Sequence, residues 1–269
     1  MNCTLDNQAN FSRIDLSRRI KIPNKLTPEL AELTGIIAGD GHIYFNNQKR
    51  KQMYCIWISG SISEDSVYYK NRINKIFYDL FNLNFTFSTQ RRDELIVRIY
   101  SKAITSFFKD IGIKTGNKTA RNYIPSKILI SDDNIKIGFL RGIFDTEFSI
   151  MFKKDYHGKH SRPILSLRMK SFKFISQLKS LLKYFDFTIV FYKDKFFDKR
   201  SKKFNIGYKL ELGGKKNLKK FTELIGFRNP KHLTKIEIWK RFGFYPPRLS
   251  YQQRLSILNG KIDVNQFYR

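Results

Sequence analysis

The strongest constraint on the fold is an internal repeat. Residues 35–40 (GIIAGD) align with residues 142–147 (GIFDTE), about a hundred residues further along the chain. Two more pairs keep nearly the same spacing, residues 76–87 with 181–191 and residues 107–118 with 221–232. A spacing that recurs in this way indicates two copies of one structural unit. Each copy is predicted to run as helix, two strands, helix, two strands, helix.

The repeat also divides the chain. We expect the first copy over residues 28–130 and the second over residues 131–245. An N-terminal extension (1–27) then lies outside the repeat and either caps the fold or reaches over a ligand. A C-terminal extension (246–269) also lies outside the repeat and is predicted to add a short helix. Thr27-Pro28 and Ser131-Asp132 are predicted helix starts at the head of the two copies, because such residues cap helix N-termini.

Three segments alternate apolar and polar residues, which is typical of strands with one buried face. They cover residues 94–100, 164–170 and 204–212. The expected buried face of the third segment comprises Phe204, Ile206, Tyr208, Leu210 and Leu212. The helices predicted near 66–81 and 171–185 carry apolar residues at three- and four-residue spacing and are expected to cover these buried faces.

The charge indicates what the polar faces bind. Lys and Arg number 51 against 23 Asp and Glu, which gives a formal charge of +28. Such an excess implies a polyanionic partner, most often nucleic acid, rather than a merely solvated surface. A sheet ribbon fits the DNA major groove. We therefore expect contacts to DNA from four residues of the polar faces, namely Arg98, Arg168, Lys170 and Lys209.

Several classes of protein are disfavoured by the sequence. No apolar run approaches the ~20 residues needed to cross a bilayer, and the N-terminus lacks the apolar centre of a signal peptide. We therefore expect an intracellular protein, in the cytoplasm or an organelle, that has no membrane partner and is not secreted. Cys3 and Cys55 are too few for a disulfide framework or a four-cysteine zinc site.

The repeated helix ends in an acidic residue in both copies. Gly35 and Gly39 share one helix face, as do Gly142 and Thr146, and small residues at this spacing let two helices approach closely. Side-by-side packing would bring Asp40 and Glu147 together at the C-terminal ends. Two such carboxylates repel one another unless a cation lies nearby, and they suit Mg²⁺. The pair predicts metal-assisted phosphodiester hydrolysis; the alternative is two polar helix ends without function.

The stretches LTGIIAGDG and LRGIFDTEF resemble the two signature motifs of the LAGLIDADG homing endonucleases in their monomeric, two-motif form. The resemblance implies an α+β fold of two pseudo-symmetric αββαββα repeats, whose antiparallel sheets form a saddle on double-stranded DNA. It implies that Asp40 and Glu147 hold Mg²⁺ or Mn²⁺ near the scissile phosphates. The backbone carbonyls of Gly39 and Thr146 are further implied ligands.

The resemblance also suggests basic residues at the site. The sequence GNKT (116–119) resembles the family's basic element, which makes Lys118 a catalytic candidate. In the second copy His232 stands in register and is expected to contact DNA, with Lys231 and Lys235 nearby. Phe148 departs from the family, which usually has glycine after the second acidic residue, and it is expected to crowd the second half of the site.

These features predict a monomeric, site-specific double-strand DNA endonuclease. The resemblance implies a long asymmetric target, 3′ overhangs, and a gene that is intron-encoded or free-standing. The main alternative is an intron RNA maturase, or a cleavage-dead DNA-binding protein on the same scaffold. Intact acidic residues in both copies favour the nuclease, because an RNA-binding protein does not need them.

Overall fold

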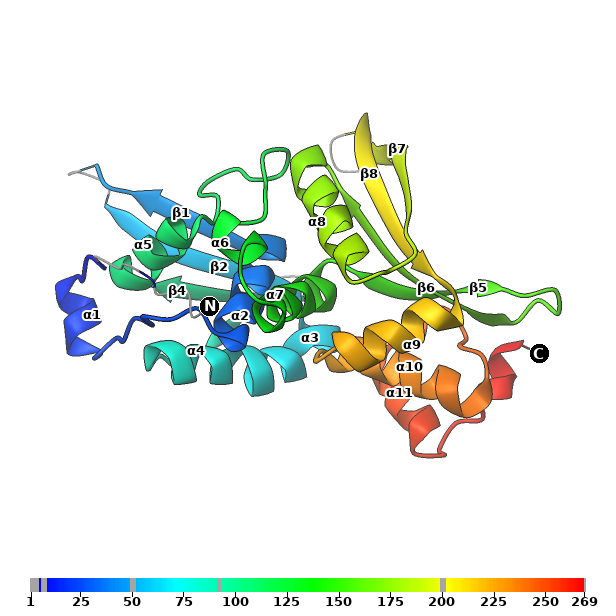
Figure 1. The fold of residues 1–269 in the computed structure, drawn as a ribbon. Coiled ribbons are helices and arrows are strands. Elements are labelled where there is room, and N and C mark those ends of the chain that lie inside the picture. The colour runs from blue at the N-terminus through cyan, green and yellow to red at the C-terminus, as the bar shows by residue number, and fades with distance from the viewer. Residues whose placement is uncertain (1–4, 6–8, 49–51, 91–92, 199–201, 269) are drawn as a thin grey trace.

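The computed structural model describes residues 5, 9–48, 52–90, 93–198 and 202–268. It contains two similar halves, each with a four-stranded sheet and covering helices, joined at their centre by helices α2 and α7 (Figure 1). The first half comprises α2 (Pro28–Gly39), β1 (Gly41–Asn46), β2 (Met53–Ser61), a continuous helix of α3 (Ile62–Tyr68), η1 (Tyr69–Ile73) and α4 (Asn74–Phe81), β3 (Phe87–Gln90), β4 (Glu94–Tyr100) and α5 (Lys102–Ile111).

The second half follows a short helix, α6 (Ser126–Leu129), and repeats this order. It comprises α7 (Asp133–Thr146), β5 (Ser149–Lys154), β6 (His160–Met169), α8 (Phe172–Tyr184), β7 (Val190–Asp198), β8 (Lys203–Gly213), α9 (Gly214–Leu224) and α10 (Pro230–Phe242). The strand orders, β1-β2-β4-β3 and β5-β6-β8-β7, are equivalent, and all neighbours are antiparallel. The predicted α+β class with two antiparallel sheets is confirmed.

Helices α2 and α7 pack with almost no side chain between them. A Cβ at Gly35 would overlap the carbonyl oxygen of Phe139, and a Cβ at Gly142 would overlap that of Glu32. Gly138 lies equally close to the backbone of Pro28, a contact that the repeat alignment missed. Thr27 and Asp132 cap the two helices by accepting hydrogen bonds from backbone N–H groups. The predicted close helix pair is therefore present.

The long helices cover the apolar sides of the sheets as expected. Phe77 and Phe81 of α4 and Leu178 and Leu182 of α8 are fully buried. The first of these helices begins earlier than predicted, at Ile62, because Ser61 caps it by accepting from the backbone N–H of Glu64.

One prediction about β8 is wrong. Phe204 and Ile206 were expected in the core, yet they are 67% and 51% exposed. The β7–β8 hairpin continues beyond Met169, the last residue of β6, so its end leaves the cover of the sheet and helices. The alternation of apolar and polar residues correctly predicted the sheet face of each side chain. It could not predict where the covering helices and strands end.

Both terminal segments pack on the repeat. Asp15 of α1 (Arg13–Ser17) is buried and accepts a hydrogen bond from the backbone N–H of Ala103. Cys3 lies outside the described residues, and Cys55 is a buried free thiol. Within the described part of the chain, no helix has the length and hydropathy needed to span a membrane.

The C-terminal helix α11 (Tyr251–Leu258) connects the two halves; the 3₁₀ turn η2 (Val264–Tyr268) follows it. The buried guanidinium of Arg254 forms an ion pair with Glu64 of α3 and donates to Thr234 Oγ1 of α10 at 2.9 Å. The backbone N–H of Tyr251 also donates to Glu64, at 3.0 Å. Lys235 lies in this region, where burial and the charge of Arg254 lower its pKa from 10.5 to about 8.

Replacing Gly142 with alanine is expected to destabilise the protein by about 1–3 kcal/mol, because the added methyl group overlaps the backbone of α2. Denaturant unfolding of the variant measures this loss. Gly213→Ala is the matched control, since the nearest atom to its new Cβ is Ile164 Cγ1 at 4.0 Å. Equal stability of the two variants would contradict the close packing of α2 and α7.

The lowered pKa of Lys235 predicts a pH dependence of stability. Between pH 8 and 10.5 the unfolded chain binds more protons at this lysine than the folded protein, so the unfolding free energy rises with pH. Relative to Lys235→Met, the wild type should gain up to about 1.4 kcal/mol per pH unit in this window. Parallel stability curves for the two proteins would show that Lys235 keeps its ordinary pKa.

Candidate active site

The two acidic helix ends meet at the centre of the molecule. Asp40 follows the last residue of α2 and Glu147 follows the last residue of α7, and both have αR backbone angles. A Cβ at Gly39 would lie 3.0 Å from Glu147 Cγ and would overlap the Thr146 hydroxyl. The absence of a side chain at Gly39 therefore allows the two helix ends to touch.

The carboxylates lie in an environment that disfavours two negative charges. Burial raises the pKa of Asp40 well above its usual value, and the charge of Glu147 raises it further. Burial also raises the pKa of Glu147, while Lys118 and Lys231 lower it. A cation beside this pair would stabilise the ionised forms.

Lys118 lies next to this pair. Its Nζ donates to the carbonyl oxygens of Ile37, Ala38 and Gly39 at 2.8, 2.6 and 2.6 Å, and so neutralises the negative end of α2. Burial lowers the pKa of Lys118 to about 8, despite the opposing effect of Glu147 and Asp40. The structure thus brings Lys118, Gly39 and Glu147 together.

The prediction for His232 is wrong. Its side chain is 1% exposed and stacks on Phe227 at 4.3 Å between ring centroids, so it cannot contact DNA from this position. Burial lowers its pKa well below the ordinary value, which keeps the ring neutral. The neighbouring residue, Lys231, is the one whose charge acts on the two carboxylates.

Lys231 is the basic residue that the second half supplies. Its Nζ forms an ion pair with Asp65 Oδ1 at 2.9 Å, and its charge lowers the pKa of both Asp40 and Glu147. Asp65 belongs to α3 of the first half and also accepts from Asn229 Nδ2 at 2.8 Å. The start of α10 is therefore tied to the opposite half of the molecule.

Asp145 is a further acidic residue that sequence reasoning missed. It accepts hydrogen bonds from the backbone N–H groups of Arg228 and Asn229, each at 2.9 Å, and from the Tyr68 hydroxyl at 3.2 Å. Burial raises its pKa to about 7. Asp145 holds the loop before α10 in place. An acidic residue inside the apolar stretch GIFDTEF was the available signal.

A cavity of about 480 Å³ opens onto this centre and is lined by residues of both halves. Its lining includes Gly39, Lys118, Asn122, Glu147, Arg168, Lys170 and Phe196. Arg168 forms an ion pair with Asp194 at 2.6 Å, and Lys170 donates to Asn205 Oδ1 at 3.1 Å. Two of the residues expected to bind DNA therefore lie beside the acidic centre.

The other two residues expected to bind DNA lie in different sheets, Arg98 in the first and Lys209 in the second. Arg98 of β4 is opposite Trp57 of β2, and its guanidinium lies 5.7 Å from the indole centroid. Lys209 of β8 is opposite Arg168 and forms an ion pair with Glu211 at 2.7 Å. Glu211 raises the pKa of Lys209, so this lysine stays charged but is partly neutralised.

Phe148 does not enter the site. It is 1% exposed and stacks on Phe144 with 3.8 Å between ring centroids. The expected crowding by this ring is wrong, because Phe148 directly precedes β5 and its side chain is buried in the core. The Thr146 hydroxyl donates to the carbonyl of Gly142 at 2.8 Å.

The two carboxylates fit a divalent metal ion, whose coordination shell they fill only in part. Asp40 and Glu147 are hard oxygen ligands, and burial raises the pKa of both, so a bound cation would favour their ionised forms. No cluster of three or more acidic, histidine or cysteine side chains occurs among the described residues. Backbone carbonyls, water and phosphate oxygens would supply the remaining ligands.

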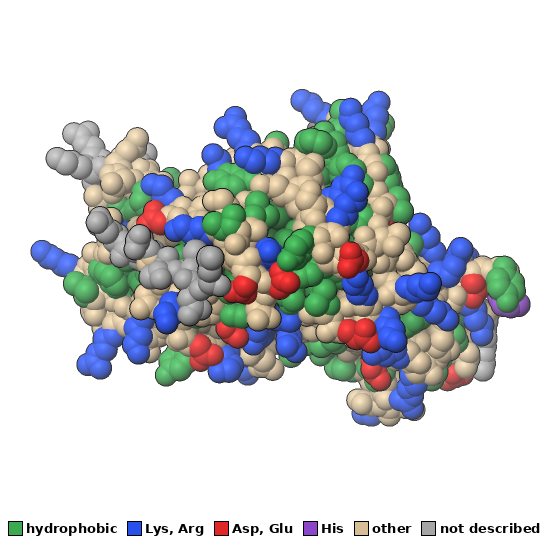
Figure 2. All heavy atoms as spheres, in the orientation of Figure 1, with side chains coloured by type: hydrophobic (Ala, Val, Ile, Leu, Met, Phe, Trp, Pro, Cys, Tyr) green, Lys and Arg blue, Asp and Glu red, His purple; other side chains and the backbone are tan. Residues whose placement is uncertain are grey.

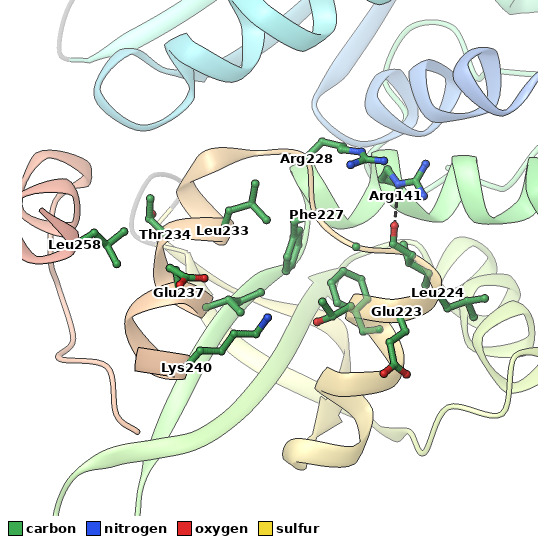
Figure 3. Close-up of a pocket in the computed structure, with 15 residues that line it drawn as sticks. Arg141, Glu223, Leu224, Phe227, Arg228, Leu233, Thr234, Glu237, Lys240 and Leu258 are labelled. Carbon is green, nitrogen blue, oxygen red and sulfur yellow. Dashed lines mark hydrogen bonds between the residues drawn. The ribbon is translucent and has the colours of Figure 1, made fainter. Parts of the chain in front are cut away.

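A second large cavity, of about 490 Å³, lies between α9, α10 and α7 (Figure 3). Arg141 Nε donates to the carbonyl of Ile225 there at 2.8 Å, and Glu223, Glu237 and Lys240 also line the cavity. Its acidic and basic groups are interspersed, and it does not include the residues of the acidic centre.

Comparisons with known proteins agree with this geometry. Residues 134–226 match the family model of the LAGLIDADG-like domain. The homing endonuclease I-DmoI is similar in structure, with a TM-score of 0.53 and 16% identity over 74% of this chain and 91% of that chain. I-DmoI in complex with DNA and Ca gives 0.54 and 17% over 79% and 98%. A point mutant of I-SmaMI gives 0.50 and 12% over 90% and 94%.

Two curated relatives from Methanocaldococcus jannaschii are 26% identical to the chain. One is a glutamine–fructose-6-phosphate aminotransferase, matched over 81% of this chain and 18% of its own length. The other is the tRNA-splicing ligase RtcB, matched over 77% of this chain and 22% of its own length. The chain thus spans less than a quarter of the length of either relative. The two relatives also have different activities, so neither activity can be assigned to this chain.

The molecule has two halves with equivalent sheets, joined by two helices that are each followed by an acidic residue. This arrangement agrees with both the family match and the structural similarities. Residues 134–226 match the LAGLIDADG-like domain, and the chain has the fold of the homing endonuclease I-DmoI.

Proposed function

We propose that the protein is a site-specific DNA endonuclease that hydrolyses one phosphodiester bond in each strand of a duplex. The observation that carries this proposal is the contact of the two helix ends that carry Asp40 and Glu147, beside a cavity that Glu147 lines together with Lys118, Arg168 and Lys170. Carboxylates beside basic groups can hold a metal ion and a phosphate together. The formal charge of +28 supports a polyanionic substrate.

The implied cofactor is Mg²⁺ or Mn²⁺, held by Asp40 and Glu147 with the backbone carbonyls of Gly39 and Thr146. Bound there, the metal would activate water and stabilise charge on the phosphate. Structures of I-DmoI in complex with DNA and Ca or Mn support a divalent ion in this fold. Lys118 and Lys231 would offset the negative charge that collects at the reacting phosphate.

The duplex would lie along the faces that carry Arg98, Arg168, Lys170 and Lys209. The pseudo-symmetry of the halves supports one monomer that acts on both strands, at a long asymmetric target because the two faces differ in sequence. Cleavage with 3′ overhangs, and a gene carried in an intron or free-standing, are further parts of the proposal that rest on the family resemblance alone.

The alternatives are an intron RNA maturase and a cleavage-dead DNA-binding protein. A protein that only binds nucleic acid has no use for two carboxylates forced together at a cost in stability. Phe148 was the main sequence feature against cleavage, and its burial in the core removes that objection. The endonuclease therefore remains the better supported function.

Asp40→Asn and Glu147→Gln should each reduce cleavage by about 100-fold or more, because each removes a metal ligand and several kcal/mol of charge stabilisation. DNA binding should persist, since both changes reduce repulsion of phosphates. Cleavage and binding of a random duplex library would be measured with Mg²⁺ and with EDTA. The control is Glu223→Gln, an exposed acidic residue of α9.

The library also separates the alternatives. Mg²⁺-dependent ends with one stagger at one long motif would support the endonuclease. Enriched binding without new ends would favour the cleavage-dead protein, and enrichment of structured RNA over duplex DNA would favour the maturase.

Binding should weaken steeply with salt, because lysine and arginine release counterions from the phosphates they neutralise. A plot of log affinity against log salt concentration measures this effect. Arg168→Ala should lower the slope by about one, and binding should weaken similarly on all sequences if Arg168 contacts phosphate alone. A flat response in the wild type would contradict a face that follows the DNA backbone.

A further inference from the structure

The two halves differ in the length of one hairpin. When Asp40 is aligned with Glu147, the pair Trp57–Arg98 of the first sheet corresponds to Ser166–Glu211 of the second. The β3–β4 pairing ends at Gln90–Glu94. In the same alignment Glu94 corresponds to Gly207 of β8, which pairs with Asp194. The β7–β8 pairing continues for four more residue pairs, from Lys195–Ile206 to Asp198–Lys203. This hairpin extension has no equivalent among the described residues of the first half.

The extension projects from the second sheet and is rich in basic and apolar side chains. Figure 1 shows β7 and β8 rising beyond the rest of their sheet, and Figure 2 shows lysine, arginine and hydrophobic side chains together around that end. Phe197 and Phe204 lie on one face of the hairpin and are more than half exposed, at 51% and 67%. Phe196 lies on the opposite face.

Phe196 is held in place by its surroundings. The Arg168 guanidinium lies 4.8 Å from the ring centroid, and Lys170 Nζ lies 5.9 Å from it. Asp194 fixes Arg168 by an ion pair at 2.6 Å. Gly207 leaves room for the ring, since a Cβ there would lie 3.0 Å from Phe196 Cε1. An aromatic ring beside basic side chains is typical of nucleic-acid contacts.

The ring belongs to the same cavity as the acidic centre. Phe196 lines it together with Glu147 and Gly39, while Lys118 and Asn122 line it from the first half. A phosphate that reaches Glu147 would therefore be neutralised by Arg168 and Lys170. The nucleotide attached to that phosphate would lie against the Phe196 ring.

We propose that Phe196 is a nucleobase contact, whose ring stacks on a base next to the phosphate cut at Glu147 and so sets base preference at that cut. The inference rests on the proposed endonuclease function. Because the described part of the first half has no equivalent of the hairpin extension, the preference applies to the Glu147 cut and not to the Asp40 cut. Base–aromatic stacking is sequence-tolerant in single strands. In a duplex, however, the base must partly unstack, which favours flexible steps.

The test compares motifs selected from a random duplex library by the wild type, Phe196→Ala and Phe196→Leu. Both variants should lose base preference beside the Glu147 cut, keep it beside the Asp40 cut, and bind the wild-type motif about tenfold more weakly. Phe196→Trp should retain the preference, since it keeps a stacking surface. Phe197→Ala is the matched control, from the opposite face of the same strand, and should reproduce the wild-type motif.

A second readout does not depend on cleavage. 2-Aminopurine placed beside the Glu147 cut should brighten when the wild type binds in EDTA, and it should brighten less with Phe196→Leu, which keeps apolar volume but has no aromatic face. If the wild type enriches no duplex, the proposed function fails and this inference with it. If the wild type enriches a motif that Phe196→Ala and Phe196→Leu both reproduce base for base, the inference alone is overturned.

Discussion

The close contact of α2 and α7 is the constraint on which the rest of the structure depends. Gly35, Gly138 and Gly142 let the two backbones touch, and Gly39 lets the helix ends meet. This contact sets the distance between Asp40 and Glu147 and the position of one sheet relative to the other. Since protein interiors are close-packed, a single added methyl group on this interface displaces both halves of the site.

Forcing the acidic helix ends together has an electrostatic cost that the surrounding residues offset. Lys118 bonds the last carbonyls of α2, and Lys231 lies on the other side, held by Asp65. Asn229 connects Asp65 to the loop that Asp145 fixes. Asp65 of the first half therefore positions Lys231 of the second half, and the end of α2 positions Lys118. Glu64 and Arg254 extend the same connection to the C-terminal helix.

The pseudo-symmetry is strong in the centre and weak at the edges. The registers of β1–β2 and β5–β6 are equivalent around the acidic residues, whereas the β7–β8 hairpin is longer than β3–β4. The Glu147 side carries an aromatic ring, Phe196, that lies near two cations, Arg168 and Lys170. A target read by two such unequal faces would be asymmetric, and the two cuts would differ in their surroundings.

The sequence by itself determined the architecture and the acidic pair. Residue spacing in the repeat, strand alternation and small residues at helical spacing are local patterns, and they were sufficient to predict the two halves, the α2–α7 pairing and the meeting of Asp40 with Glu147. Burial and final register are decided by distant parts of the chain. The tertiary structure alone therefore revealed that Lys231 replaces His232, that Phe148 lies in the core, that Phe204 and Ile206 extend beyond their cover, and that Phe196 joins the acidic cavity.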